Sequence, residues 1–151
     1  MSKFAYIEDM KTWREEFSFS IDIKIRFSET DMFGHMNNVS VFTYFEEARI
    51  EFMNKIELFD FNGNPDELPI VADLQCDYHA QVYFGESIKL YVKPAKLGNS
   101  SIDIHYMAVK KDGTICFTGR GKLVKVNIKT GKPSPLTDGE KSKLKIKPVA
   151  N

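Results

Sequence analysis

The sequence predicts an α+β domain in which an antiparallel sheet of five to six strands wraps around one long helix. Residues 38–58 carry apolar side chains at spacings of three and four, the pattern of a helix with one buried face. Segments on either side alternate apolar and polar side chains, as half-buried strands do. Because antiparallel strands must cover their apolar face, we expect them to pack against that helix.

The first strand and the helix follow each other closely along the chain. In IDIKIRF, residues 21–27, the isoleucines and Phe27 fall on one face and the charged residues on the other. The helix would be roughly 30 Å long at a rise of about 1.5 Å per residue. The segment FNGNPDELP, residues 61–69, is rich in turn formers and is predicted to end it.

Four further strands are predicted, at residues 70–78, 87–93, 101–109 and 115–128. The segments LGN and DG supply turns between them. In the first of these strands, Ile70 and Leu74 are expected on the same face. In the last, Gly119 and Gly121 share a face with Phe117, which indicates close packing by a neighbour, and the long helix is the expected neighbour.

Composition limits the partners that the chain can attract. Among 151 residues, Lys plus Arg and Asp plus Glu number 21 each, so no overall charge draws the protein to nucleic acid or to an anionic membrane. We expect one domain over residues 1–151, with a core at 17–135. An N-terminal extension at 1–16 is expected to form a short amphipathic helix, and residues 136–151 a solvated tail.

Neither secretion nor membrane insertion is indicated by the sequence. The first residues, MSKFAYIEDMKTW, lack the apolar run of a signal peptide, and no segment reaches the length of a membrane span, so we expect a cytoplasmic protein. Cys76 and Cys116 lie alone in strand-like segments and are interpreted as reduced core residues, with no metal site and no cofactor. In the C-terminal tail, one helical turn is expected to begin at Thr137 or Asp138.

One run of the sequence carries a family resemblance. ETDMFGHMNNVSVFTYFEEAR resembles the hotdog-fold acyl-CoA thioesterases of the 4-hydroxybenzoyl-CoA thioesterase type, in which an aspartate-Gly-His-Asn-Asn loop leads into the central helix. Matches to the same family continue in order with YHAQVYFGESIKL, KLGNSS and TGRGKLVKVNIKTGKP, and together they cover residues 17–135. The resemblance implies a hotdog fold and hydrolysis of an acyl thioester of coenzyme A.

The resemblance also implies roles for residues of the loop before the helix. Asp31 matches the family's catalytic carboxylate. The backbone N–H of Asn38 falls where the family contacts the thioester carbonyl. Gly34, His35 and Asn37 complete the matching loop and are expected to help position the substrate.

General chemistry supports a carboxylate at the start of this helix. The first N–H groups of a helix lack internal partners and, with the helix dipole, can stabilise an oxyanion. A carboxylate beside them can activate water or attack the carbonyl carbon itself, and the sequence does not choose between these routes. The alternative for Asp31 is a turn residue that only satisfies backbone donors. His35 is either a base or substrate-orienting group or a brace of its own loop, and His79 and His105 are interpreted as surface or edge residues.

The chain departs from the family pattern at two positions. Val41 stands where many relatives have Tyr, which is expected to change the shape of the pocket. Asn38 stands where one subgroup has His, which removes an acid or base from that position. The identity of the acyl group is therefore left open.

Three other polar residues are candidates for the site. Glu46 and Glu47 are candidates because another branch of hotdog thioesterases uses a glutamate of the helix. Glu46 and Arg49 are also spaced as a surface ion pair, and we favour that structural interpretation. Ser101 matches the Ser or Thr after the family's Leu-Gly turn, so its hydroxyl either faces the active site across a subunit boundary or caps the turn.

Coenzyme A requires cations for its phosphates. The candidates near the last hairpin are Lys110, Lys111, Arg120 and Lys122, although a solvated sheet face predicts the same residues.

The expected function is therefore hydrolysis of acyl-CoA, or of an acyl carrier protein thioester, to the free acid and a thiol. The alternative from another class is a sensor or carrier that binds acyl-CoA without hydrolysing it. A dehydratase or hydratase is less favoured because neither a His-Phe-Pro-Gly run nor an Asp-x-Asn-x-x-His motif is present. Because the family builds its sites between subunits, a homodimer or a homotetramer is expected.

Overall fold

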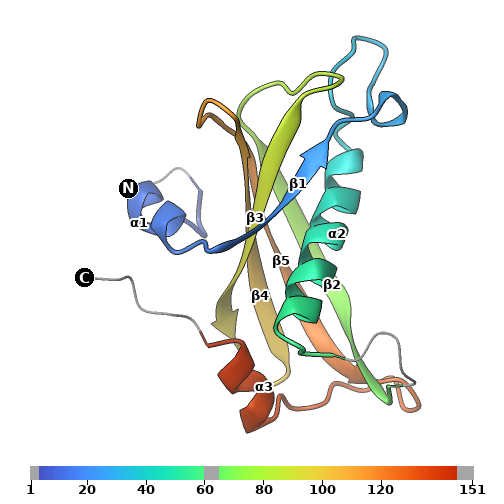
Figure 1. The fold of residues 1–151 in the computed structure, drawn as a ribbon. Helices are drawn as coiled ribbons and strands as arrows, with labels where there is room; N and C mark the ends of the chain where they lie inside the picture. The colour runs from blue at the N-terminus through green and yellow to red at the C-terminus, as the bar shows by residue number, and fades with distance from the viewer. Residues whose placement is uncertain (1–3, 60–64, 146–151) are drawn as a thin grey trace.

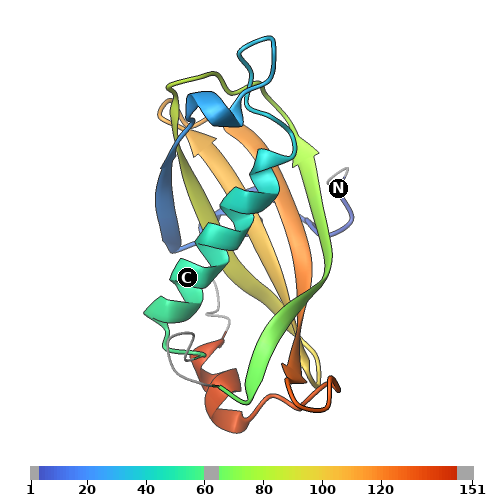
Figure 2. The ribbon, with the colours of Figure 1, turned by 90° about the vertical axis from the view of Figure 1, so that its right-hand side faces the viewer.

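The structure, a computed structural model, describes residues 4–59 and 65–145 (Figure 1). The elements follow in the order α1 Met10–Glu15, β1 Phe19–Lys24, the 3-10 helix η1 Phe27–Glu29, α2 Ser40–Lys55, β2 Glu67–Tyr78, β3 Ser87–Leu97, β4 Ser101–Lys110, β5 Ile115–Asn127 and α3 Asp138–Lys143. The five strands form one antiparallel sheet in the order β1-β3-β4-β5-β2, and α2 lies along one face of it (Figure 2). The predicted α+β architecture, with a sheet around one long helix as in the hotdog fold, is confirmed.

The main core lies between α2 and the sheet. Phe45 of α2 is fully buried and stacks on Tyr106 of β4, with ring centroids 4.1 Å apart. Gly119 of β5 leaves room for the Phe45 ring, because a Cβ built at Gly119 would lie 2.6 Å from the nearest ring carbon. The predicted close approach of the helix is therefore confirmed at Gly119. At Gly121 the neighbour is instead Leu74 of β2, whose Cδ1 would lie 2.7 Å from a Cβ.

Helix α2 is shorter than its apolar period predicted. It spans Ser40–Lys55 rather than residues 38–58. Glu57 has a φ of 54°, a left-handed conformation, so the chain has left the helix there. Leu58 is nevertheless buried in the main core, which is why the apolar period continues past the end of the helix. The predicted turn after it falls partly on residues 60–64, outside the described part of the chain.

Strand β2 contains a β-bulge that the sequence did not indicate. Its register against β5 shifts just after Val71. Ile70 lies opposite Val124, whereas Leu74 lies opposite Gly121, so the Ile70 and Leu74 side chains are on opposite faces of the sheet. The expectation that both share a face is wrong, because strict alternation does not anticipate an extra residue.

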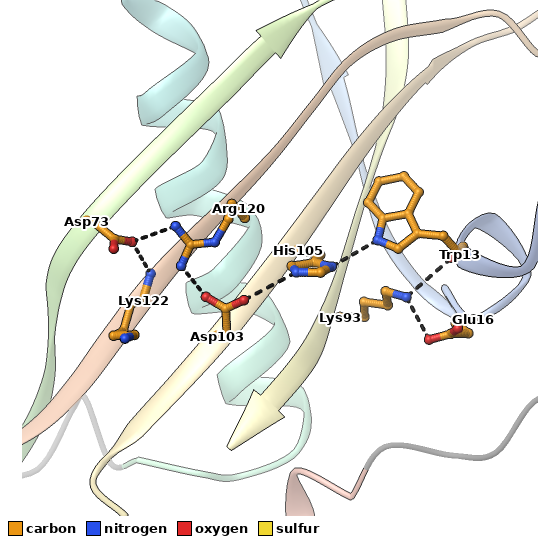
Figure 3. A network of polar contacts seen from close by, with 8 residues as sticks. All are labelled: Trp13, Glu16, Asp73, Lys93, Asp103, His105, Arg120 and Lys122. Carbon is orange, nitrogen blue, oxygen red and sulfur yellow. Dashed lines mark hydrogen bonds and ion pairs between the residues drawn. The ribbon is translucent and has the colours of Figure 1, made fainter. Parts of the chain in front are cut away.

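The N-terminal segment covers the outer face of the sheet, on the side away from α2 (Figure 1). Helix α1 confirms the short helix predicted in the N-terminal extension, and its Trp13 packs with Phe17 and Met107 in a second apolar cluster. The Trp13 Nε1–H donates a 2.9 Å hydrogen bond to Nδ1 of His105 (Figure 3). His105 is only 6% exposed, so its interpretation as a surface or edge residue is wrong: the extension covers that strand face.

The C-terminal segment packs on the domain. Leu136 and Leu144 are both buried in the main core, so the expectation of a solvated tail is wrong for the described residues up to 145. Two apolar residues set among lysines gave no periodic signal for this contact. The predicted helical turn is confirmed: the Thr137 side chain accepts the N–H of Glu140 at the start of α3.

None of the helices in the described ranges has both the length and the apolar character that a membrane crossing requires.

Candidate active site

The loop between β1 and α2 is closed by its own backbone. The Asp31 N–H donates to the carbonyl of His35 at 2.8 Å, and the Gly34 N–H donates to the carbonyl of Asp31 at 3.1 Å. Thr30 and Met36 flank these bonds and form an isolated β-bridge. Gly34 has a φ of 78°, a left-handed conformation that only glycine adopts readily. These contacts hold Asp31 in a closed turn between β1 and α2.

The two carboxylate oxygens of Asp31 have different surroundings. Oδ1 accepts the backbone N–H groups of Phe33 at 2.8 Å and His35 at 3.1 Å. Oδ2 lies 4.0 Å from Nδ1 of His35, and the Asp31 side chain is 38% exposed. Asp31 therefore carries out the turn-forming role that was its structural alternative, and it does so with one oxygen.

Asn37 fixes the backbone immediately before α2. Its N–H donates to the carbonyl of Glu29 at 2.7 Å, and its Oδ1 accepts the N–H of Val39 at 2.8 Å. The carbonyl of Asn37 accepts the N–H of Ser40 at 3.1 Å. Between these anchored groups, the N–H of Asn38 makes no hydrogen bond to any residue that the structure describes.

Asp31 and Asn38 line one hollow of about 380 Å³. Its wall consists of Asp31, His35, Met36, Asn38, Tyr78, His79, Ala80, Gln81 and Val82. The segment after β2 is tied to the loop, since the Met36 N–H donates to the Val82 carbonyl at 2.6 Å. The hollow is therefore lined by the carboxylate residue Asp31, by Asn38, whose N–H has no partner among the described residues, and by Tyr78 at the end of β2.

His35 lies against aromatic side chains at the rim. Its ring meets Tyr83 edge-on, with centroids 5.1 Å apart, and the two residues form an isolated β-bridge. The centroid of the Phe33 ring lies 6.2 Å from that of His35. His35 is thus held both by its loop and by the segment after β2, while its Nδ1 remains near Asp31.

The alternative carboxylates and Ser101 are not among the residues that line this hollow. Glu46 lies on α2, where its Oε2 is 3.6 Å from Nη2 of Arg49, and the neighbouring Glu47 is exposed. Ser101 begins β4, paired opposite Val124, whereas the Asp31 loop adjoins the end of the sheet where β2 finishes. A Cβ at Gly98 would meet the Ser101 Oγ, so Ser101 packs into the turn before its strand.

The four candidate cations separate into two groups. Lys110 and Lys111 line a second hollow of about 450 Å³ with Gly85, Glu86, Ser87 and Asp112, and Lys110 Nζ lies 3.2 Å from Glu86. Arg120 lies on the outer face and pairs with Asp73 at 3.0 Å and with Asp103 (Figure 3). Lys122 adjoins it, with its backbone N–H bonded to Asp73. Only the lysine pair lies near the Asp31 loop, since Tyr83, the bridge partner of His35, is 5.7 Å from Lys110 Nζ.

Sequence reasoning did not nominate Tyr78, the last residue of β2. Its hydroxyl donates a 2.6 Å hydrogen bond to the carbonyl of Asn38, forty positions away in the chain. The alternation of β2 predicted only which face this residue occupies. The sequence carried no signal for a contact between the end of one strand and the start of a distant helix.

Comparisons with known proteins identify the family. A model of the thioesterase-like superfamily matches residues 25–144. The protein YsmA of Bacillus subtilis is 43% identical over 141 residues, covering 93% of this chain and 95% of YsmA. A solved structure described as a predicted thioesterase from Bacillus stearothermophilus is 32% identical, with a TM-score of 0.73 over 83% of this chain and 92% of that one. The DHNA-CoA thioesterase of Staphylococcus aureus, 24% identical, shares the fold with a TM-score of 0.72 over 78% and 79% of the two chains. The chain therefore belongs to the thioesterase-like superfamily.

Proposed function

We propose that this protein is an acyl-CoA thioesterase of the 4-hydroxybenzoyl-CoA thioesterase type, with Asp31 as its catalytic carboxylate. Membership of the thioesterase-like superfamily supports hydrolysis of an acyl thioester. The observation that carries the proposal is the hollow that contains both Asp31 and Asn38. A free N–H at a helix entrance and a carboxylate with one unbound oxygen are the two groups that thioester hydrolysis needs.

The proposed reaction begins with the thioester carbonyl at the Asn38 N–H, which stabilises the negative charge that develops on oxygen. In the general-base route, Asp31 Oδ2 takes a proton from water as the water oxygen adds to the carbonyl carbon. The tetrahedral intermediate then collapses, the carbon–sulfur bond breaks, and the thiolate takes up the proton. In the nucleophilic route, Asp31 Oδ2 attacks the carbonyl carbon, the carbon–sulfur bond breaks and the thiolate leaves as the mixed anhydride forms. Water then hydrolyses the anhydride to the free acid and the Asp31 carboxylate, and a proton released in this step goes to the thiolate.

Oxygen-18 water tests for the nucleophilic route in which water attacks the Asp31 carboxyl carbon of the anhydride. During a single turnover, label in the Asp31 carboxylate excludes the simple general-base route, because only anhydride hydrolysis transfers a water oxygen to the enzyme. Label found only in the product acid excludes attack of water on the Asp31 carboxyl carbon of the mixed anhydride.

Coenzyme A is the proposed carrier of the acyl group. Lys110 and Lys111 supply positive charge in the second hollow, next to the segment that bridges to His35, and phosphates favour such cations. Arg120 and Lys122 are the less favoured candidates because they lie on the outer face with Asp73 and Asp103. Lys110 also pairs with a carboxylate, that of Glu86, but it lies beside Tyr83 and so near the Asp31 loop. A DHNA-CoA thioesterase of this fold, by its name, acts on a CoA thioester.

A homodimer through the edge strand β2 is part of the proposal. β2 has 12 residues and is paired on one side only within the described sheet. Ile70 and Val71 on this strand are 51% and 43% exposed. A long edge strand with exposed apolar side chains favours pairing with a second copy, which would also enclose the hollow at the end of β2.

The test is release of free thiol from a panel of short-chain, long-chain and aromatic acyl-CoA substrates, with one acyl carrier protein thioester included. Turnover of at least one CoA thioester is expected, and the preferred acyl group identifies the substrate class. Turnover of the carrier-protein thioester alone would replace coenzyme A as the carrier. Binding of acyl-CoA without any turnover would contradict hydrolysis and favour a sensor or carrier.

A further inference from the structure

We infer that Tyr78 is a positioning residue of the proposed thioesterase, which holds the Asn38 N–H in place through a hydrogen bond to the Asn38 carbonyl. The inference rests on the proposed function and adds to it a residue from a different element. The Tyr78 hydroxyl lies 2.6 Å from the carbonyl oxygen of Asn38, and both residues line the same hollow. Tyr78 ends strand β2, whereas Asn38 precedes helix α2, so the bond joins the two sides of the opening.

The carbonyl of Asn38 has no other partner within the described residues. In a regular helix it would accept the N–H of Phe42, four positions later. The Phe42 N–H instead donates to the carbonyl of Val39, at 3.2 Å. The Tyr78 hydroxyl therefore supplies the hydrogen bond that the helix does not, at a carbonyl that would otherwise depend on water.

Three bonds fix the backbone on both sides of the Asn38 N–H. The peptide between Asn38 and Val39 is held at its carbonyl by Tyr78 and at its N–H by Oδ1 of Asn37. The peptide before it is held at the Asn37 carbonyl by the N–H of Ser40. Rotation about the Asn38 bonds would have to break one of these contacts, so the direction of the free N–H is fixed before substrate binds. Such preorganisation is what gives an oxyanion-stabilising donor its effect.

Tyr78 is suited to this role by its environment. Its side chain is half exposed, and because a phenol hydroxyl ordinarily has a pKa near 10, which partial desolvation raises further here, the group is protonated at neutral pH and donates to the carbonyl. Its backbone is fixed by pairing opposite Phe117, and the next residues are held because the N–H groups of His79 and Ala80 both donate to the carbonyl of Cys116. A rigid strand end therefore sets the position of a helix entrance.

The test is steady-state kinetics of Tyr78→Phe, which removes only the hydroxyl. We expect kcat to fall about 3- to 10-fold, the loss expected for one neutral hydrogen bond, with KM within about twofold of wild type. The amide resonance of Asn38 in a ¹⁵N–¹H spectrum is expected to shift in this variant. Tyr91→Phe is the matched control: Tyr91 is half-buried on the outer face against Phe17 and lies outside the hollow, so kcat and the Asn38 resonance should stay unchanged.

Two outcomes would overturn the inference separately from the proposed function. Wild-type turnover that Tyr78→Phe leaves unchanged would refute the positioning role alone. A loss of kcat that accompanies an equal loss in Tyr91→Phe, or that follows a fall in melting temperature with no shift at Asn38, would show general destabilisation instead. Absence of wild-type turnover on every thioester would overturn the proposed function, and this inference with it.

Discussion

At the scale of single residues, Asp31 combines a structural and a chemical role by dividing them between its oxygens. Oδ1 accepts two backbone N–H groups of its own loop, while Oδ2 lies 4.0 Å from Nδ1 of His35, and the residue lines the hollow. An aspartate that only forms a turn would need just the hydrogen bonds that Oδ1 accepts from the loop backbone. The distinction is testable because asparagine keeps an acceptor oxygen for the loop and loses the ability to take a proton or to attack a carbonyl.

His105 shows how a second buried network holds the N-terminal segment to the sheet (Figure 3). The Trp13 Nε1–H can only donate, so Nδ1 of His105 accepts and its proton resides on Nε2, which lies 3.3 Å from Asp103. Burial lowers the pKa of His105 to about 4 from its ordinary 6.5, with Asp103 opposing the shift and Lys93 reinforcing it. The imidazole is therefore neutral in the folded protein at neutral pH.

This shift predicts a pH dependence of stability. Between about pH 6.5 and 4, the unfolded chain binds a proton at His105 that the folded protein does not. The free energy of unfolding should therefore be fully maintained above pH 6.5 and fall as the pH drops toward 4, by up to roughly 3 kcal/mol from this group.

Urea unfolding of wild type and His105→Asn across this pH range checks the prediction. Asn retains an acceptor for Trp13 but does not titrate, so its stability should fall less steeply with acidification. Equal slopes for the two proteins would show that other groups cause the dependence.

At the scale of elements, the packing of α2 on β5 depends on an absent side chain. A Cβ at Gly119 would lie 2.5 Å from the carbonyl of Gln75 and 2.6 Å from the ring of Phe45. Gly119→Ala is therefore expected to lower the free energy of unfolding by about 1–3 kcal/mol, as overpacking does. Gly139→Ala in α3 is the control, since its Cβ would have no contact closer than 3.8 Å; it should be neutral or slightly stabilising. Chemical denaturation measures both, and equal stability of the two variants would contradict this packing.

The sequence predicted most helices and strands because each buries one face, so its apolar side chains recur with the period of a helix or of a strand. IDIKIRF alternates strictly, and Ile23 and Ile25 are indeed buried. The predicted strand over residues 21–27 is wrong at its end, however, because β1 stops at Lys24 and Phe27 begins η1 and is 78% exposed. The bulge in β2 and the end of α2 were not predicted, since an inserted residue and a left-handed residue at Glu57 leave the apolar composition unchanged. The burial of His105 was missed for a related reason: alternation identifies the polar face of a strand but not whether another segment covers it.

The candidate site was predictable only where it is local in the chain. Asp31, His35 and Asn37 lie within one loop, and the family resemblance drew attention to them together. The structure adds that Asn37 anchors its neighbours on both sides, and that the Asn38 N–H has no hydrogen-bond partner in the described part of the chain. Tyr78 contacts this loop only in the folded protein, because it lies forty positions from Asn38. Neither the sequence of the loop nor that of β2 predicts this contact.

At the scale of the whole molecule, the sheet has two unequal edges within the described chain. β1 has 6 residues and β2 has 12, and Ile70 of β2 is exposed next to the bulge. We predict a dimer at micromolar concentration in sedimentation velocity experiments, weakened at least tenfold by Ile70→Lys because a charge would be buried at the joined edges. Asp22→Lys on β1, where the side chain is 78% exposed, should leave the dimer intact. A monomeric wild type would contradict this assembly.

The central claim is that Asp31 performs chemistry and does not merely shape its loop, and kcat of Asp31→Asn on the best thioester of the panel tests it most directly. Asp9→Asn is the matched control, because Asp9 likewise accepts a backbone N–H, from Thr12 at the start of α1, and lies outside the hollow. With melting temperatures of both variants near that of wild type, the account predicts that kcat falls about 10²- to 10⁴-fold in Asp31→Asn alone. A folded Asp31→Asn protein that turns over substrate at the wild-type rate would contradict the account and move the search to Glu46, Glu47 or His35.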